Sequence, residues 1–175
     1  MTVTDTLDRA ELVRLYDEHS PELYRYAYRL LGAQELAEEC VADTFTRFLK
    51  ALQEKRGPRN HLRAYLYRIA HNWIIDYFRK QKPVDGLDEH AEFIQAEQVS
   101  PENQVINNEL AGQIRQYLAR LTPEQSQVVA LKHLEGMSNE EVAEIMERNV
   151  GSVKALNSRA LENFRKFMRQ DGLAI

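Results

Sequence analysis

Apolar residues recur at intervals of three and four along most of this chain, which is the spacing of one buried face of an α-helix. No stretch rises above this pattern with the apolar-polar alternation of a half-buried β-strand. The pattern therefore predicts an all-α protein. The predicted helices cover, in order, residues 8–19, 21–31, 34–53, 62–81, 101–120, 123–135, 138–146 and 150–168.

Residues typical of helix ends support these limits. Ser20 followed by Pro21 predicts a helix start, because serine can cap the first amides and proline suits the first helical position. Gly32 predicts the end of that helix, since glycine adopts the left-handed backbone of a C-cap at little cost. Thr122 and Ser138 each open a capping box, with Gln or Glu three residues later.

The last two predicted helices are separated by three polar residues, which predicts a helix-turn-helix over residues 137–168. Such a motif places the start of its second helix in the major groove of DNA. The outer face of that helix is rich in hydrogen-bond donors. We expect base contacts from Ser152, Lys154, Asn157 and Ser158, and phosphate contacts from Arg159, Arg165 and Lys166. The alternative interpretation is an amphipathic helical hairpin with a solvated charged face.

The helix predicted over residues 62–81 carries a second set of side chains suited to nucleic acid. Arg68, Asn72, Ile75 and Arg79 fall on one stripe, and aromatic residues are interleaved with them. Aromatic rings among basic residues can stack on unpaired bases, although we assign most of these rings to the core and leave Tyr65 open. The basic loop before this helix, residues 55–61, could form a pocket for a flipped base. We expect His71 to be polar or to face a phosphate.

The net charge of −4 conceals three segments of opposite sign. Residues 55–82 hold eight Lys or Arg against one acid, residues 83–109 hold seven acids and no Lys or Arg, and residues 147–169 hold six Lys or Arg against two acids. One-sided basic segments are the electrostatic signature of nucleic-acid binding. We therefore predict two small helical domains, 1–82 and 110–175, joined by an acidic linker.

Other features limit the class of protein. The one cysteine, Cys40, excludes an intramolecular disulfide, and the five histidines show no metal-ligand spacing. We therefore expect no metal, no cofactor and no enzymatic activity. No apolar run is long enough to span a membrane, and the polar N-terminus is unlike a signal peptide, so we expect a cytoplasmic protein.

Three segments resemble the extracytoplasmic-function (ECF) group of bacterial sigma factors, small members of the sigma-70 superfamily. AEECVADTFTRFLKAL, residues 37–52, is similar to regions 2.1 and 2.2, and LRAYLYRIAHNWIIDYFRK, residues 62–80, is similar to regions 2.3 and 2.4. Residues 121–167 resemble region 4, with G-S-V-K at 151–154 leading into the recognition helix. The resemblance covers almost the whole chain. It implies two helical domains, region 2 and region 4, in a factor that directs core RNA polymerase to promoters.

The resemblance also implies roles for individual residues. In this family region 2 docks on the clamp helices of the polymerase β′ subunit, which points to Glu39, Asp43, Thr44 and Arg47. Region 2 also opens and holds the −10 promoter element, which points to Arg56, Arg59, Asn60, Arg63, Arg68, Asn72, Asp76 and Arg79. Region 4 sits on the β flap and reads the −35 element as duplex, which points to Arg148, Ser152, Val153, Lys154, Asn157, Ser158 and Arg159. The resemblance further implies an anti-sigma factor as regulator, and we expect the free chain to be a monomer.

Two points stay open. Glu147 stands where the family's helix-turn-helix usually has Gly, so either Glu147 takes the left-handed conformation, at about 1 kcal/mol, or the turn shifts onto Asn149, which tolerates it. The alternative function is a helix-turn-helix regulator that binds operators as a dimer. It explains residues 137–168 but gives residues 61–82 no role, and no dimerisation heptad is evident.

Overall fold

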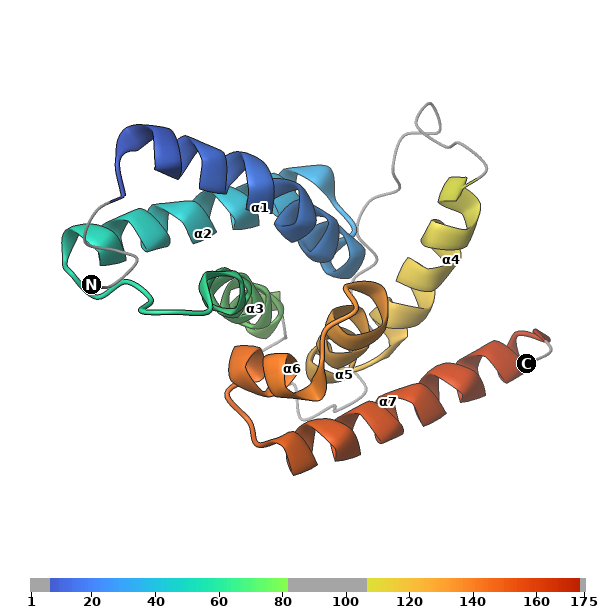
Figure 1. Ribbon diagram of the computed structural model, residues 1–175. Coiled ribbons are helices and arrows are strands. Elements are labelled where there is room, and N and C mark those ends of the chain that lie inside the picture. Colours follow the sequence, from blue (N-terminus) through green and yellow to red (C-terminus); the bar gives the residue numbers. More distant parts are fainter. Residues whose placement is uncertain (1–6, 82–106, 174–175) are drawn as a thin grey trace.

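The computed structural model describes residues 7–81 and 107–173, and every regular element in these ranges is a helix (Figure 1). This confirms the predicted all-α class. The elements are α1 (Arg9–Leu31), α2 (Gln34–Gln53), α3 (Leu62–Gln81), α4 (Asn107–Arg120), α5 (Pro123–Val129), the π-helix η2 (Ala130–Leu134), α6 (Asn139–Met146) and α7 (Val150–Gln170). The predicted limits of α2 and α3 agree with the structure. The predicted start of α4, at residue 101, lies outside the described residues.

The two helices predicted before Gly32 form one continuous helix, α1, with Pro21 inside it. Proline removes one helical hydrogen bond, but apolar packing on both sides of it keeps the helix intact. Tyr16, before the proline, packs on Phe45 of α2 with 4.9 Å between ring centroids, and buried residues follow the proline. The break predicted at Ser20 is therefore wrong. Gly32 ends α1 as predicted, with a left-handed φ of 73°.

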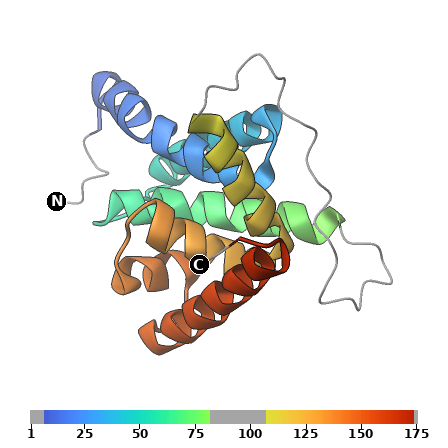
Figure 2. The same ribbon diagram turned by 90° about the vertical axis from the view of Figure 1, so that its right-hand side faces the viewer.

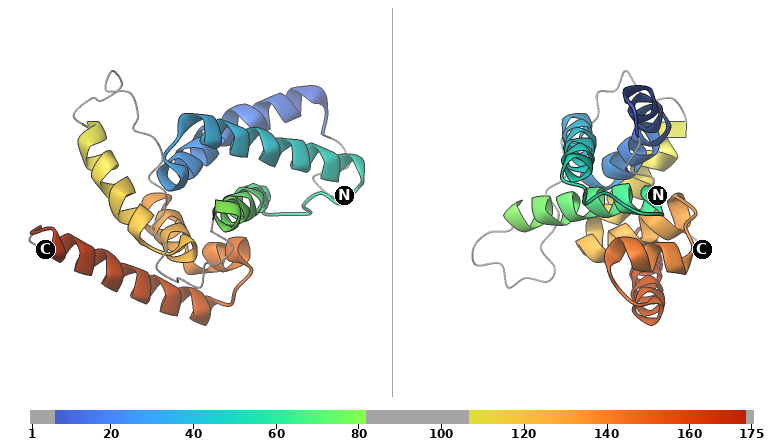
Figure 3. Two further views of the ribbon diagram at one scale, coloured as in Figure 1. Left: turned by 180° about the vertical axis from the view of Figure 1, so that it is seen from behind. Right: turned by 60° about the vertical axis from the view of Figure 1, so that its left-hand side comes forward.

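Helices α1, α2 and α3 form the first domain. The turn at Gly32 sets α1 and α2 side by side, and α3 packs across both of them (Figures 1 and 3). The core of this domain consists of buried side chains from all three helices: Leu23, Tyr26, Ala37, Cys40, Phe48, Leu66, Tyr67 and Ile74. Burying apolar surface stabilises such a core by roughly 25 cal/mol per Å².

Elements α4 to α7 form the second domain. Thr122 caps α5 through the predicted capping box with Gln125. The helix predicted to continue to residue 135 widens into η2 after Val129, and Gly136 then redirects the chain with a φ of 70°. The core of this domain is built from Leu118, Leu121, Val128, Leu131, Ile145, Val153 and Ala160.

The two domains pack against each other along α3. One side of α3 faces α1 and α2, and the other side faces α5 and α6 (Figure 2). Helix α1 also contacts α4 and η2. Helix α7 lies at the outer edge of the second domain, with α5 and α6 between it and α3 (Figure 1). Most of the predicted acidic linker lies outside the described residues, although residues 107–109 already belong to α4.

Candidate nucleic-acid interface

Helices α6 and α7 form the predicted helix-turn-helix, and side-chain caps fix both helix starts. Ser138 accepts a hydrogen bond from the Glu141 amide at 3.1 Å, and Asn149 accepts one from the Ser152 amide at 2.7 Å. Between the helices, Glu147 has φ 54° and ψ 46°, the left-handed conformation that favours glycine. Asn149 is extended, with φ −79° and ψ 162°, so the alternative that placed the turn on Asn149 is wrong.

The predicted base-contacting face of α7 is largely open to solvent. Its exposed or half-buried members are Ser152, Lys154, Asn157, Ser158 and Arg159. Within this face, Oδ1 of Asn157 lies 2.9 Å from Nε2 of His133. Val153 is the exception, because it is fully buried in the core of the second domain. Its assignment as a DNA contact is corrected to a packing role.

The predicted −10 residues divide into an exposed and a covered group. The exposed ones are Arg56, Arg59, Asn60, Asn72, Asp76 and Arg79. Arg63 and Arg68 are half-buried: Arg63 lies beside Glu22 of α1 and Glu141 of α6, and Arg68 lies beside Glu147 of the second domain. Two of the exposed arginines have an acidic neighbour: Arg56 pairs with Glu54, and Arg79 lies 3.9 Å from Asp76.

The aromatic rings of α3 face inward. Trp73 and Tyr77 stack with 5.8 Å between their centroids and lie against the core, as predicted. Tyr65 packs on Phe48 at 6.1 Å, and the Arg68 guanidinium lies 5.8 Å from its ring. All aromatic residues of α3 are buried or half-buried. Stacking on a base would therefore require these side chains, or the domain packed over them, to move.

His71 lies in the contact between the domains and is only 6% exposed, so it does not face solvent in this arrangement. Its carbonyl accepts a hydrogen bond from Nε2 of Gln127 in α5 at 3.1 Å, and its Nδ1 has no hydrogen-bond partner within the described part of the chain. Burial, and then the nearby charge of Arg148, lowers the pKa of His71 to about 4. The imidazole is therefore neutral at pH 7. Arg148 itself pairs with Glu124 of α5.

A polar pocket of about 390 Å³ lies beside His71, between the two domains. It is lined by residues predicted for three different tasks: Arg47 for the polymerase, Asn72, Asp76 and Arg79 for the −10 element, and Arg148 for the −35 element. These side chains come together only because the domains are packed face to face. No local pattern predicts this, since the residues come from α2, α3 and the segment before α7.

The predicted polymerase contacts lie on α2. Glu39, Asp43 and Arg47 follow one another at intervals of four on an accessible face, and Arg47 pairs with Asp43 at 2.9 Å. Thr44 differs, because it is fully buried and its hydroxyl donates a hydrogen bond to the Cys40 carbonyl at 2.7 Å. Thr44 has no surface to offer a partner, so its assignment is corrected to a packing role.

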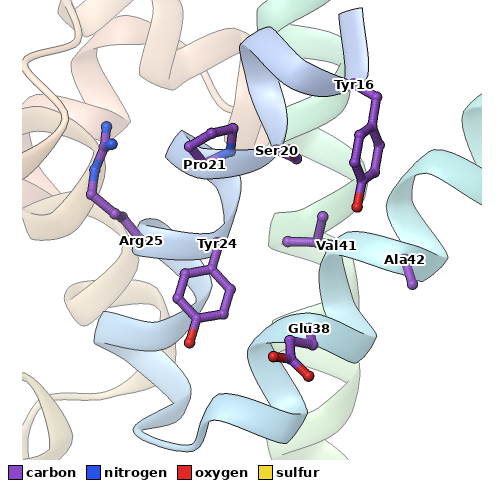
Figure 4. Close-up of a pocket in the computed structure, with 8 residues that line it drawn as sticks. All are labelled: Tyr16, Ser20, Pro21, Tyr24, Arg25, Glu38, Val41 and Ala42. Atoms are coloured by element: carbon purple, nitrogen blue, oxygen red, sulfur yellow. The ribbon is translucent and has the colours of Figure 1, made fainter. Parts of the chain in front are cut away.

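A groove that sequence analysis missed lies between α1 and α2. It has a volume of about 450 Å³, and Figure 4 shows Tyr16, Pro21 and Tyr24 of α1 around it, with Val41 and Ala42 of α2. Tyr16 is 48% exposed, so the groove presents apolar surface to solvent. The sequence feature that could have predicted this groove is that α1 has more apolar residues than one buried helical face requires.

The acidic side of α6 contacts α3, which sequence analysis also missed. Three pairs cross between the domains: Glu141–Arg63 at 3.7 Å, Glu144–His61 at 3.0 Å and Glu147–Arg68 at 3.4 Å. Residues 139–147 hold four acids and no Lys or Arg, and this one-sided charge could have predicted that the segment contacts a basic surface.

A carboxylate is buried in the same contact. The side chain of Glu135, which follows η2, is only 3% exposed. It accepts hydrogen bonds from Nη1 of Arg29 at 3.0 Å and from the Tyr67 hydroxyl at 3.2 Å, and Arg25 lies 3.9 Å away. Such partners are what allows a charge to be buried. Burial, and then the charge of Glu135, raises the pKa of Tyr67, which keeps its hydroxyl a donor.

Within residues 7–81 and 107–173, no three His, Cys, Asp or Glu side chains gather into a possible metal site. Among the helices of these ranges, none has the length and apolar character needed to cross a membrane.

Comparison with known proteins matches two families in succession. The family described as Sigma-70 region 2 matches residues 15–84, and the family described as Sigma-70, region 4 matches residues 111–164. The chain is 30% identical over 172 residues to the ECF RNA polymerase sigma factor SigW of Bacillus subtilis, covering 93% of this chain and 91% of SigW. It is 31% identical over 160 residues to the ECF RNA polymerase sigma factor BldN of Streptomyces coelicolor, covering 90% of this chain but only 60% of BldN.

Two solved structures share the fold. CnrH, in complex with the cytosolic domain of CnrY, is similar with a TM-score of 0.71 at 20% identity, over 94% of this chain and 91% of that chain. The sigma factor RpoE, in complex with the anti-sigma factor NepR from Bartonella quintana, is similar with a TM-score of 0.65 at 21% identity, over 91% of this chain and 97% of that chain. At these identities the likeness concerns the arrangement of helices.

Proposed function

The chain belongs to the extracytoplasmic-function sigma factors, and we propose on this basis that it binds core RNA polymerase and directs transcription initiation from specific promoters. The observation that carries the proposal is that one chain holds both matched regions in order, each with an accessible basic surface. The alternative, a regulator that binds operators through its helix-turn-helix alone, does not explain why residues 15–84 match Sigma-70 region 2. The chain then acts in the cytoplasm, where the polymerase is, and as a monomer until it binds the polymerase.

Region 4 reads the −35 element as duplex and sits on the β flap of the polymerase. The support for the DNA contact is the open outer face of α7, which holds Lys154, Ser158 and Arg159 exposed near the N-terminal half of the helix. This half is the part of a recognition helix that meets base edges. Asn157 and Ser152 lie on the same face, while the neighbouring Arg148 supplies a phosphate contact.

Region 2 opens and holds the −10 element with α3 and the loop before it. The proposed contacts are Arg56, Arg59, Asn60, Arg63, Arg68, Asn72, Asp76 and Arg79. Extruding a base costs a few kcal/mol, so we expect this surface to act only when core polymerase holds the promoter. The isolated chain should therefore bind promoter duplex weakly.

The accessible face of α2 binds the clamp helices of the polymerase β′ subunit through Glu39, Asp43 and Arg47. We propose in addition that an anti-sigma factor regulates the chain, because both similar structures are complexes, one of them with an anti-sigma factor. The apolar groove of Figure 4 adjoins the α2 face. A partner helix lying in this groove would compete with the polymerase for α2.

A binding experiment with core RNA polymerase tests the proposal. The chain should form a one-to-one complex with core polymerase, and the Asp43→Lys variant should weaken it at least tenfold by reversing a charge at the contact. Glu18→Lys, the same charge reversal at an exposed acid of α1 outside the α2 face, is the matched control and should bind as the unchanged chain does. Absence of a complex with core polymerase would refute the proposal.

A further inference from the structure

The packed arrangement of the two domains is incompatible with simultaneous contact to both promoter elements. The −10 and −35 elements are centred about 25 base pairs apart, which is roughly 85 Å of duplex at 3.4 Å per base pair. In the structure, side-chain contacts of 3.0 to 3.7 Å join α6 of region 4 and the residue after it to α3 of region 2 and the residue before it. The 25 residues 82–106 that connect the domains can extend to roughly 85 Å at most. The chain can therefore reach both elements only after the domains separate.

The contact covers part of the surface proposed for the −10 element. Arg63 and Arg68 are the covered members of that surface, with side chains 39% and 34% exposed. Arg63 lies 3.2 Å from Glu22 of its own domain and 3.7 Å from Glu141 of region 4, and Arg68 lies 3.4 Å from Glu147 of region 4. Carboxylates and phosphates present the same charge and the same acceptor oxygens to arginine. The acids of α6 thus occupy positions that DNA phosphates would need.

The backbone conformation of Glu147 suggests that its carboxylate contributes to the contact between the domains. Its φ of 54° suits glycine and strains any other side chain, yet the chain has glutamate at this position. What the glutamate adds is a carboxylate 3.4 Å from Arg68 in the other domain.

Beneath these exposed pairs lies a buried polar centre that fixes the position of the two domains. The carboxylate of Glu135 is held by Arg29 and Tyr67 of region 2, and Gln127 donates a hydrogen bond to the His71 carbonyl of α3. A shift of one domain against the other would break these buried hydrogen bonds and leave polar atoms without a partner, which costs free energy. The buried hydrogen bonds therefore favour one relative position of the two domains.

The face of α7 proposed for the −35 element is not covered by this contact. Lys154, Ser158 and Arg159 remain exposed in the same arrangement. The closed chain therefore presents one DNA-binding surface and withholds the other.

We propose that region 4 inhibits region 2 within the free chain: Glu141, Glu144 and Glu147 stand in for promoter phosphates on α3, and the domains separate when core polymerase is bound. This inference rests on the proposed function, since it describes how the −10 surface is regulated. It differs from regulation by an anti-sigma factor, because both the inhibitor and its target belong to one chain.

The first variant opens the contact without disturbing the local fold. It combines Glu144→Gln with Glu147→Gly, because glycine suits the left-handed φ at position 147. The matched control combines Glu140→Gln and Glu162→Gln, two exposed acids of region 4 with no ion pair among the described residues. Small-angle X-ray scattering measures opening with the chain alone. Run-off transcription at limiting chain concentration, on promoters selected from a genomic library, measures the effect on initiation.

The second variant locks the contact reversibly. Cysteines replace His61 and Glu144, whose side chains lie 3.0 Å apart, and a short bis-methanethiosulfonate reagent links them until dithiothreitol releases them. The native Cys40 does not interfere, because it is fully buried and burial raises the pKa of its thiol to about 12.

We expect the opening variant to have a larger radius of gyration and at least threefold more initiation, and the control to match the unchanged chain. We expect the locked chain to lose initiation and to regain it with dithiothreitol. An open variant with unchanged initiation, an unchanged chain that is already open, or a locked chain that initiates normally would overturn the inference. If the opening variant keeps the radius of gyration of the unchanged chain, initiation by the cross-linked chain, before and after dithiothreitol, tests the inference alone. Failure of the proposed function is distinct, because no form of the chain, open or locked, would then bind core polymerase.

Discussion

Acidification should loosen the contact between the domains, because His71 is buried there as a neutral imidazole. In the packed chain its pKa is lowered to about 4 from 6.5, first by burial and then by Arg148. Separation of the domains exposes His71 and returns its pKa toward 6.5. Between these two values the open form binds more protons than the closed form. The closed form is therefore fully favoured above pH 6.5 and loses stability as the pH falls toward 4.

The linkage relation gives the size of the effect. At pH 5.5 the closed form should be less stable than at pH 7 by about 1.2 kcal/mol, roughly an eightfold change in the closed-to-open ratio. The limit, reached below pH 4, is about 3.4 kcal/mol. Other charged groups around the same pocket are Arg47, Asp76, Arg79 and Glu124. A His71→Gln variant retains all of them, so the difference between the two chains isolates the imidazole.

Energy transfer between one dye in each domain measures the opening. Suitable exposed positions are 35 on α2 and 169 on α7, each replaced by cysteine. The measurements are made in a His61→Gln background, so that the His61–Glu144 pair, which crosses the same contact, does not contribute. Transfer should decrease between pH 7 and 5.5 in the chain with His71 and change much less with Gln at this position. An equal pH response in both chains would refute the reasoning.

Three further changes test the assignment of surfaces. Arg68→Ala with Asn72→Ala should preserve affinity for core polymerase but impair melting of the −10 element, and undiminished permanganate reactivity of promoter thymines would contradict this. Lys154→Ala with Asn157→Ala should abolish discrimination among −35 duplexes while core binding persists; an unchanged promoter profile in competition binding would show that other residues read the element. Asn149→Ala removes the N-cap of α7 and should lower the free energy of unfolding by about 1 kcal/mol, and an unaltered urea denaturation curve would exclude this capping role.

Helices with a continuous apolar stripe and clear end signals were predictable from the sequence. The limits of α2 and α3 agree with prediction because both conditions hold there, with Gly32 before α2 and a Gly-Pro loop between the two helices. The prediction failed at Pro21, where a local start signal competed with packing. Contacts of α1 with α2 on both sides of Pro21 outweigh one missing hydrogen bond, and no local pattern reports the strength of those contacts.

The errors in the candidate site have a similar origin. Thr44 lies four residues from both Cys40 and Phe48, so helical geometry places it on the buried stripe of α2 although it is polar. Val153 is buried by the corresponding stripe of α7. Lys154 lies on the exposed face of α7, as the helical pattern predicts, because no core position competes for its orientation.

The contact between the domains was beyond the reach of local patterns. Glu135 and Arg29 are 106 residues apart in sequence and 3.0 Å apart in the structure. Separate surfaces were predicted for the polymerase, the −10 element and the −35 element, but the pocket beside His71 brings residues of all three together. The sequence shows which side chains are charged, and only the packing of the domains shows which charges meet.

Run-off transcription with core RNA polymerase on a genomic promoter library tests the central claim most directly. We predict discrete start sites that appear only when the chain is added, preceded by shared sequences at the −10 and −35 positions. Specific DNA binding by the chain without any new transcript, in reactions where core polymerase responds to another sigma factor, would contradict the account.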